Sequence, residues 1–101
     1  YERLIASKPN NSMLWIKYMV FYLQMAEIDK ARSVAEKALQ TILFNQDQER
    51  LNVWVALLNL ENMYGSQETI EKTFNRATQN CDSAKVHFHL AEIYARSGKQ
   101  N

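Results

Sequence analysis

The two histidines are the first candidates for chemistry, because they lie close together as His87 and His89. On a helix, positions i and i+2 project roughly 200° apart, so these two side chains cannot hold one metal ion together. We therefore interpret both as structural or surface histidines and predict no metal site. Cys81 is the one cysteine and lies in a polar turn without an adjacent histidine. A free surface thiol is a better interpretation of it than a nucleophile.

Motifs that hold cofactors or perform catalysis are absent from the sequence. It contains neither an HExxH nor a CxxC motif, and two glycines are too few for a P-loop or a glycine-rich phosphate cradle. We predict that the chain is not an enzyme and binds no cofactor.

Three basic side chains, Arg3, Lys37 and Arg76, recur at equivalent positions of the second helices of a repeat, 34 and 39 residues apart. Stacking of the repeats would align them, and we call them the basic ladder. One interpretation is a solvated helix flank with weak ion pairs to neighbouring glutamates. The other is a strip that contacts RNA phosphates or an acidic partner. We favour the first and keep these three residues as candidate contacts to a partner or RNA.

The repeat itself is clearest in residues 51–66. Trp54, Leu57, Leu60 and Tyr64 fall on one stripe of a helix there, which predicts that they pack against other helices. Aromatic side chains beside basic ones can also stack on RNA bases. The regular spacing favours packing of these aromatics over base stacking.

Local signals predict where the helices begin and end. Ser12 is expected to cap a helix that runs from 13 to about 25, and Asp47 is expected to cap the helix that contains Trp54. Gly65 is expected to end that helix with a positive φ, and Ser66 to cap the next one. The last helix is predicted to end at Gly98.

Two offsets relate these helices, one between the first and second copies of the repeat and a shorter one between the second and third. Trp15 and Trp54 are 39 positions apart, as are Ala38 and Ala77, and Leu57 and Leu90 are 33 apart. Two helices per unit with a period in the thirties indicate an all-α, right-handed α-solenoid of antiparallel helix pairs. The expected order is the end of one repeat (1–8), two repeats (12–44 and 47–80) and the first helix of another (83–98). The predicted structural core comprises Trp15, Tyr18, Ala31, Ala35, Ala38, Trp54, Leu57, Leu60, Phe74, Ala77 and Leu90.

The amino-acid composition and the net charge limit the classes of function that the chain can have. The 101 residues are 47% hydrophobic, 23% charged and 11% aromatic, which indicates a folded domain. A net charge of +1 gives no strong field toward nucleic acid or membrane, and no run of residues approaches the length of a membrane span.

We expect the chain to be a fragment of a longer solenoid. Both ends of the stack would then be open, and apolar surface around Leu4, Ile5, Phe88 and Ile93 would be exposed. This predicts self-association of the fragment through its open ends.

The helix pairs formed by residues 14–18 with 29–39, and 53–61 with 74–77, resemble HAT (half-a-tetratricopeptide) repeats. These repeats place an aromatic in the first helix and an Ala-Arg…Glu-Arg-Ala-Leu pattern in the second, although Ala35 stands where that pattern has an aromatic. The resemblance covers nearly the whole chain. It implies a protein-docking scaffold of the kind found in RNA-processing assemblies.

Residues 51–68 are more specifically similar to the carboxy-terminal repeats of the ribosomal-RNA-processing protein five family, also called programmed cell death protein eleven. This resemblance implies a nucleolar factor for pre-rRNA processing and small-subunit assembly that docks other assembly proteins. It also implies that pre-ribosomal RNA is bound mainly by other domains of the parent protein. Direct RNA binding through the basic ladder and a generic TPR-like interaction module are the alternatives.

Overall fold

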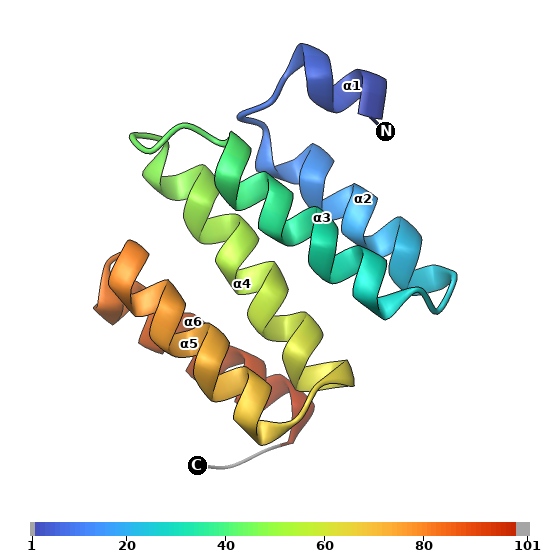
Figure 1. Cartoon of the computed structure of the whole chain (residues 1–101). Helices are drawn as coiled ribbons and strands as arrows, with labels where there is room; N and C mark the ends of the chain where they lie inside the picture. Colours follow the sequence, from blue (N-terminus) through green and yellow to red (C-terminus); the bar gives the residue numbers. More distant parts are fainter. Residues whose placement is uncertain (1, 99–101) are drawn as a thin grey trace. The chain divides into compact units, whose positions relative to one another are not determined.

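The computed structural model describes residues 2–98, and all regular structure within them is helical (Figure 1). The helices are α1 (Glu2–Ser7), α2 (Ser12–Gln24), α3 (Ile28–Thr41), α4 (Asp47–Tyr64), α5 (Gln67–Asn80) and α6 (Ser83–Ser97). The predicted all-α fold is confirmed. None of the helices in these residues is both long and apolar enough to cross a membrane.

The chain divides into two compact units, one up to Val53 and one from Trp54 on. The division falls inside α4, so the predicted repeat at 47–80 contributes residues to both units. The repeat boundaries remain predictions, and the two units are described separately below.

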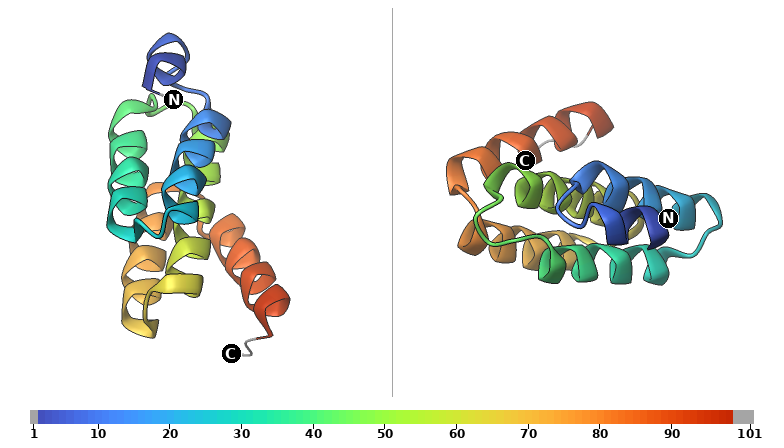
Figure 2. Two further views of the ribbon diagram at one scale, coloured as in Figure 1. Left: turned by 90° about the vertical axis from the view of Figure 1, so that its right-hand side faces the viewer. Right: turned by 90° about the horizontal axis from the view of Figure 1, so that it is seen from above.

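The first unit is built around α2 and α3, which lie side by side (Figures 1 and 2). Ala31, Ala35 and Ala38 of α3 are fully buried, and their small side chains let the α3 backbone approach its neighbours closely. Trp15 and Met19 supply the buried bulk on α2. Large residues on one helix and small ones on the other therefore set the spacing of this pair.

Asn11, not Ser12, caps α2. The Oδ1 atom of Asn11 accepts hydrogen bonds from the N–H groups of Met13 and Leu14, at 3.0 and 3.4 Å. Ser12 is instead the first helical residue and is buried, and its N–H and hydroxyl both donate to Oε1 of Glu49, at 3.0 and 3.2 Å. The predicted cap was wrong by one residue because a carboxylate from α4 binds Ser12.

Replacing Glu49 with Gln is expected to lower the free energy of unfolding by about 1 kcal/mol. A neutral amide oxygen accepts hydrogen bonds more weakly than a carboxylate does. The substitution also removes a negative charge from the start of α2. Urea denaturation followed by circular dichroism measures the change. Glu68→Gln is the matched control, since Glu68 forms only an exposed ion pair with Lys72 at 3.2 Å. An equal loss for both variants would contradict the proposed role of Glu49.

The second unit contains the end of α4 together with α5 and α6. Trp54, Leu57 and Leu60 of α4 are buried, as are Ile70 and Ala77 of α5. The predicted stripe along residues 54–60 therefore faces the core. Tyr64 does not, because it is the last residue of α4 and is 46% exposed, so its predicted packing was wrong.

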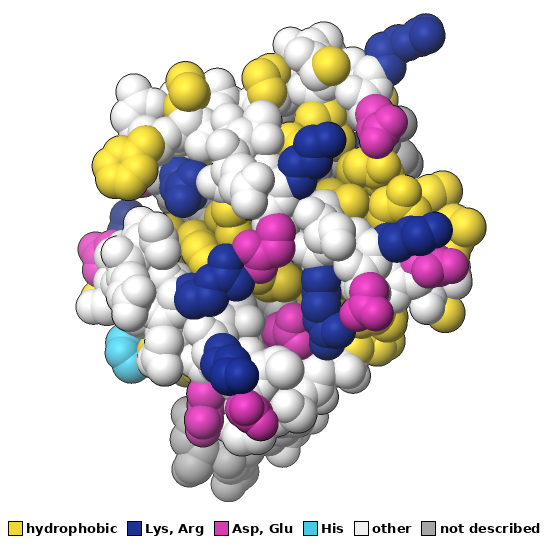
Figure 3. Space-filling view, viewed as in Figure 1, with side chains coloured by type: hydrophobic (Ala, Val, Ile, Leu, Met, Phe, Trp, Pro, Cys, Tyr) yellow, Lys and Arg dark blue, Asp and Glu magenta, His cyan; other side chains and the backbone are white. Residues whose placement is uncertain are grey.

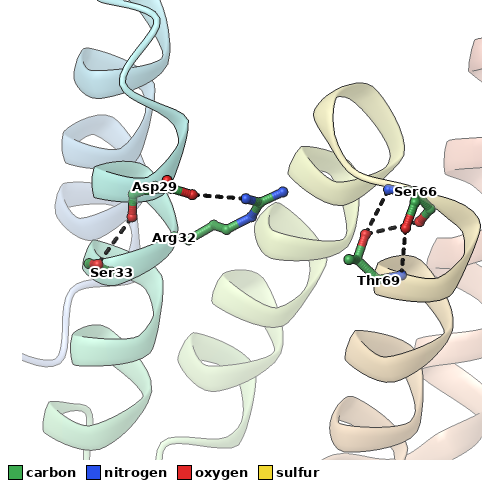
Figure 4. A network of polar contacts seen from close by, with 5 residues as sticks. All are labelled: Asp29, Arg32, Ser33, Ser66 and Thr69. Atoms are coloured by element: carbon green, nitrogen blue, oxygen red, sulfur yellow. Dashed lines mark hydrogen bonds and ion pairs between the residues drawn. The ribbon is translucent and has the colours of Figure 1, made fainter.

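Ser66 caps α5 as predicted, and the structure shows that it does so in a capping box with Thr69 (Figure 4). The N–H of Thr69 donates to the Ser66 hydroxyl at 3.2 Å, and the N–H of Ser66 donates to Oγ1 of Thr69 at 2.8 Å. Two of the helix's otherwise unpaired N–H groups are thereby satisfied. The last helix ends as predicted, with Gly98 in the left-handed region at φ 77°.

Gly65 does not use a positive φ; among the described residues of the chain, Gly98 is the glycine that does. A Cβ atom at position 65 would instead collide with Oε1 of Glu61 and Oγ1 of Thr69, and would lie 2.9 Å from the carbonyl oxygen of Glu61. Glycine is needed here for close packing of the chain, which corrects the prediction.

The exposure expected at the two ends is found for only part of the set. Leu4 and Phe88 are more than half exposed, as predicted. Ile5 and Ile93 are buried, Ile93 on the same helical stripe as the buried Val86, so this part of the prediction was wrong. Among the predicted core residues, Tyr18, Phe74 and Leu90 are partly exposed and the others are at most 2% exposed.

Candidate docking groove

A groove of about 630 Å³ opens on the first unit, between side chains of α1, α2 and α3. Its volume lies within the range of ordinary ligand-binding clefts. It is lined by Glu2, Ile5, Ala6, Pro9, Trp15, Tyr18, Tyr22, Lys30, Ser33, Val34, Lys37 and Thr41.

One wall is a stripe of α3 formed by Lys30, Ser33, Val34 and Lys37. These positions follow the i, i+3, i+4, i+7 pattern of one helix face. The two lysines are two turns apart, so their Cα atoms are separated by roughly 10 Å along the helix axis. Both lysine side chains are exposed, and the apolar Val34 lies between them.

Asp29, the acidic residue next to Lys30 in the sequence, forms its ion pair with Arg32 and not with Lys30. Oδ1 of Asp29 accepts from Nη1 of Arg32 at 3.1 Å, and the carbonyl oxygen of Asp29 accepts from the Ser33 hydroxyl (Figure 4). No ion pair within residues 2–98 joins Lys30 or Lys37 to a carboxylate. The groove therefore carries two lysine charges that described carboxylates do not neutralise.

Trp15 and Val34 give the groove an apolar, fixed floor. Both side chains are mostly buried, and the indole N–H of Trp15 donates to the carbonyl oxygen of Pro9 at 2.8 Å. This bond ties the connector between α1 and α2 to the core and holds the indole in one orientation.

Tyr18, Tyr22 and Glu2 form a polar cluster at the side of the groove. The Tyr18 hydroxyl lies 3.2 Å from the Tyr22 hydroxyl and donates to Oε1 of Glu2 at 3.3 Å. The hydrogen bond with Tyr22, partial burial and the nearby charge of Glu2 all raise the pKa of the Tyr18 phenol, the first contributing most. Nζ of Lys30 lies 5.8 Å from the centre of the Tyr22 ring, within reach of a cation–π contact.

In an alkaline titration, Tyr18 is therefore expected to ionise at a higher pH than a tyrosine does in water. A raised folded-state pKa means that the neutral phenol stabilises the fold below the unfolded-state pKa of about 10, and that this contribution is lost as the pH rises further. Ultraviolet absorbance of tyrosinate measures the titration. Tyr18→Phe should remove this high-pH step and Tyr94→Phe should retain it. A high-pH step that survives Tyr18→Phe would contradict the assignment.

The lining residues of the groove offer a surface for binding. Its lining contains neither histidine nor cysteine. The hydroxyls of Ser33 and Thr41 donate to main-chain carbonyls of their own helix, at 3.1 and 2.7 Å, so no base activates them. Aromatic and aliphatic surface beside lysines can bury apolar side chains and attract carboxylates.

The three residues of the basic ladder have different surroundings. Lys37 lines the groove, whereas Arg3 of α1 is exposed and is not among the lining residues. Arg76 belongs to the second unit, where its guanidinium carbon lies 5.0 Å from the centre of the Trp54 ring. Figure 3 shows basic and acidic side chains interspersed on the face in view. Whether the ladder contacts a partner or RNA remains a prediction.

The other candidates for chemistry lie outside the groove. The ring of His87 packs edge-on against the ring of Phe74, with the two ring centres 4.7 Å apart. Nδ1 of His89 is 3.2 Å from Oε1 of Glu92. The two histidines thus meet different neighbours. Cys81 is not in a disulfide, is partly exposed and follows the last turn of α5, where its N–H donates to the carbonyl oxygen of Ala77.

Sequence reasoning found Lys37 but missed Lys30 and Tyr22 as groove residues. Two lysines spaced i and i+7 on one predicted helix were a usable signal, because they must share a face. That this face stays open beside α1 depends on tertiary packing, which the spacing does not reveal.

Comparisons with known proteins agree with the repeat architecture. The family described as "Pre-mRNA-splicing factor Syf1/CRNKL1 C-terminal HAT repeat" matches residues 5–97. "Protein RRP5 homolog" of Homo sapiens is 62% identical over 99 residues, which are 98% of this chain and 5% of that protein. "rRNA biogenesis protein RRP5" of Arabidopsis thaliana is 50% identical, over 96% of this chain and 5% of that protein.

The homologue from Schizosaccharomyces pombe, "rRNA biogenesis protein rrp5", is 42% identical over 98% of this chain and 6% of that protein. The chain thus spans only about 5–6% of the length of these relatives. The similarity to the ribosomal-RNA-processing protein five family that residues 51–68 indicated is confirmed. With the family match over residues 5–97, the chain belongs to the HAT-repeat family of the Syf1/CRNKL1 C-terminal type.

Proposed function

We propose that this chain is a helical-repeat scaffold segment of a nucleolar factor for pre-rRNA processing and small-subunit assembly. It docks other assembly proteins and performs no catalysis, and its helix pairs stack as a right-handed solenoid. Pre-ribosomal RNA is bound mainly by other domains of the parent protein.

Two observations support this proposal. Relatives that are 42–62% identical over nearly the whole chain are named RRP5 proteins, two of them rRNA biogenesis proteins. The groove of about 630 Å³ on α1, α2 and α3 offers a mixed apolar and basic surface of the kind that receives a partner helix. The groove is the observation that supports docking. The names of the relatives are the observation that supports a role in rRNA biogenesis.

A variant that fills the groove without changing the core tests the docking function. Ser33 is exposed and lines the groove, so Ser33→Trp should block it; Gln40→Trp adds the same bulk to an exposed position of α3 outside the lining. The chain and both variants are immobilised and incubated with nucleolar proteins that have been treated with ribonuclease. Bound proteins are then cross-linked to the chain and quantified by mass spectrometry. Small-subunit assembly proteins should cross-link to the chain and to Gln40→Trp but not to Ser33→Trp. Equal recovery on all three, or no assembly protein on any, would contradict the proposal.

Direct RNA contact through Arg3, Lys37 and Arg76 is the second proposal. Lys37 is exposed and lines the same groove as Tyr18 and Tyr22, which favours this proposal because RNA-binding surfaces combine basic and aromatic side chains. A filter-binding titration with single-stranded RNA at increasing salt concentration tests RNA contact separately from protein docking. Affinity for RNA phosphates falls steeply as salt is added. Joint reversal of Lys37 and Arg76 to Glu should then abolish RNA binding, and unchanged binding would end this alternative.

A further inference from the structure

α1 already occupies one end of the groove and shows which chemistry the groove accepts from a helix. Ile5 of α1 is buried against the groove, and Glu2, one turn earlier, accepts a hydrogen bond from the Tyr18 hydroxyl at 3.3 Å. α1 thus presents a carboxylate and an aliphatic side chain at i and i+3, on one helix face. A space of about 630 Å³ is open beside these α1 residues.

The charge in that open space is positive. Lys30 and Lys37 are exposed on the groove wall without a described carboxylate partner, and the other charged lining residue is Glu2, which is already bonded to Tyr18. The long aliphatic stems of the lysines extend the apolar surface around Val34 while their ammonium groups reach solvent. A partner that covers this surface gains apolar burial and must supply negative charge at its edges.

We propose that the groove binds an acidic amphipathic helix of a partner protein. Its apolar side chains pack on the partly exposed rings of Tyr18 and Tyr22, above the buried Trp15 and Val34, and two carboxylates two turns apart meet Lys30 and Lys37. The spacing follows from the lysines, which are themselves two turns apart on α3. This inference rests on the proposed docking function and names the class of partner that the groove selects.

Synthetic peptides test the charge preference directly. The probe is a fluorescein-labelled, alanine-based helical peptide with Glu at positions i and i+7 and Leu at i+3 and i+4; matched peptides carry Gln or Lys in place of both glutamates. Fluorescence anisotropy with the 101-residue chain measures the dissociation constants. The Glu peptide is expected to bind at least about tenfold more tightly than the Lys peptide, with a preference that weakens as salt is added.

Charge reversal on the protein supplies the complementary test. Lys30→Glu combined with Lys37→Glu should invert the preference, so that the Lys peptide binds more tightly. Lys17→Glu makes the same change of charge on an exposed position of α2 outside the groove lining, and should leave the preference intact. All of these positions are exposed, and circular dichroism verifies that the variants are folded.

The outcomes separate this inference from the docking function. Equal binding of the Glu and Gln peptides, abolished by Ser33→Trp, would overturn the acidic preference and leave docking in the groove standing. Peptide binding that Ser33→Trp does not affect would overturn both. Displacement of the Glu peptide by single-stranded RNA through Lys37 would assign the groove to nucleic acid instead.

Discussion

Trp54→Ala is expected to lower the free energy of unfolding by about 3–5 kcal/mol. The indole is 2% exposed, and the guanidinium of Arg76 lies over its ring at 5.0 Å. Truncation to alanine removes the buried apolar surface, leaves a cavity and removes the cation–π partner of Arg76. Because a domain of this size is stable by roughly 5–15 kcal/mol, the variant should be unfolded in part at moderate temperature. Urea denaturation followed by circular dichroism measures the loss.

Two further substitutions show whether the loss comes from burial. Tyr64→Ala on the same helix should have little effect, because Tyr64 is half exposed. Trp54→Phe should cost about 1 kcal/mol less than Trp15→Phe. The Trp15 indole donates to Pro9, whereas the buried Trp54 Nε1 finds no acceptor among the described residues. A loss below about 1 kcal/mol for Trp54→Ala would contradict its place in the core.

Gly65→Ala is expected to lower the free energy of unfolding by about 1–3 kcal/mol through steric crowding. The added Cβ would overlap Oγ1 of Thr69, which is held by hydrogen bonds to Ser66, and would approach the carbonyl oxygen of Glu61 to 2.9 Å. Relief of this overlap requires either the capping box of α5 or the end of α4 to shift. The loss should appear in chemical denaturation together with weaker amide-exchange protection at the start of α5.

Substitution by asparagine shows whether each glycine is required for its backbone conformation or for lack of space around it. Gly98 has a φ of 77° and nothing within 4 Å of an added Cβ, so Gly98→Asn should cost little, since asparagine tolerates the left-handed region. Gly65→Asn should cost at least as much as Gly65→Ala, because the larger side chain adds to the overlap. Similar small losses at both positions would contradict the steric explanation for Gly65.

The helices were predictable because their signals are local. Hydrophobic spacing along one stripe located Trp54, Leu57 and Leu60 in the core. Ser66 marked the start of α5, and Gly98 marked the end of α6. Such signals depend on residues within one or two turns, so the sequence contains them fully.

The predictions were wrong where the local structure depends on a residue that is distant in the sequence. Asn11 and Ser12 are equally good caps by type, and the hydrogen bonds from Ser12 to Glu49, 37 residues later, settle which of them enters the helix. Gly65 was misinterpreted because the crowding around it comes from side chains of both neighbouring helices. The groove depends in the same way on where α1 lies, so Lys37 was noticed on its own helix while its partner Lys30 was missed.

The two tryptophans of the chain fall one in each compact unit, Trp15 in the first and Trp54 in the second, and both indoles are shielded from solvent. Each unit therefore contains its own intrinsic fluorophore, which requires no label. Emission from Trp54→Phe follows the melting of the first unit alone, and emission from Trp15→Phe follows the second. Their two transition midpoints, corrected for the cost of each substitution, measure how cooperatively neighbouring parts of a repeat array unfold.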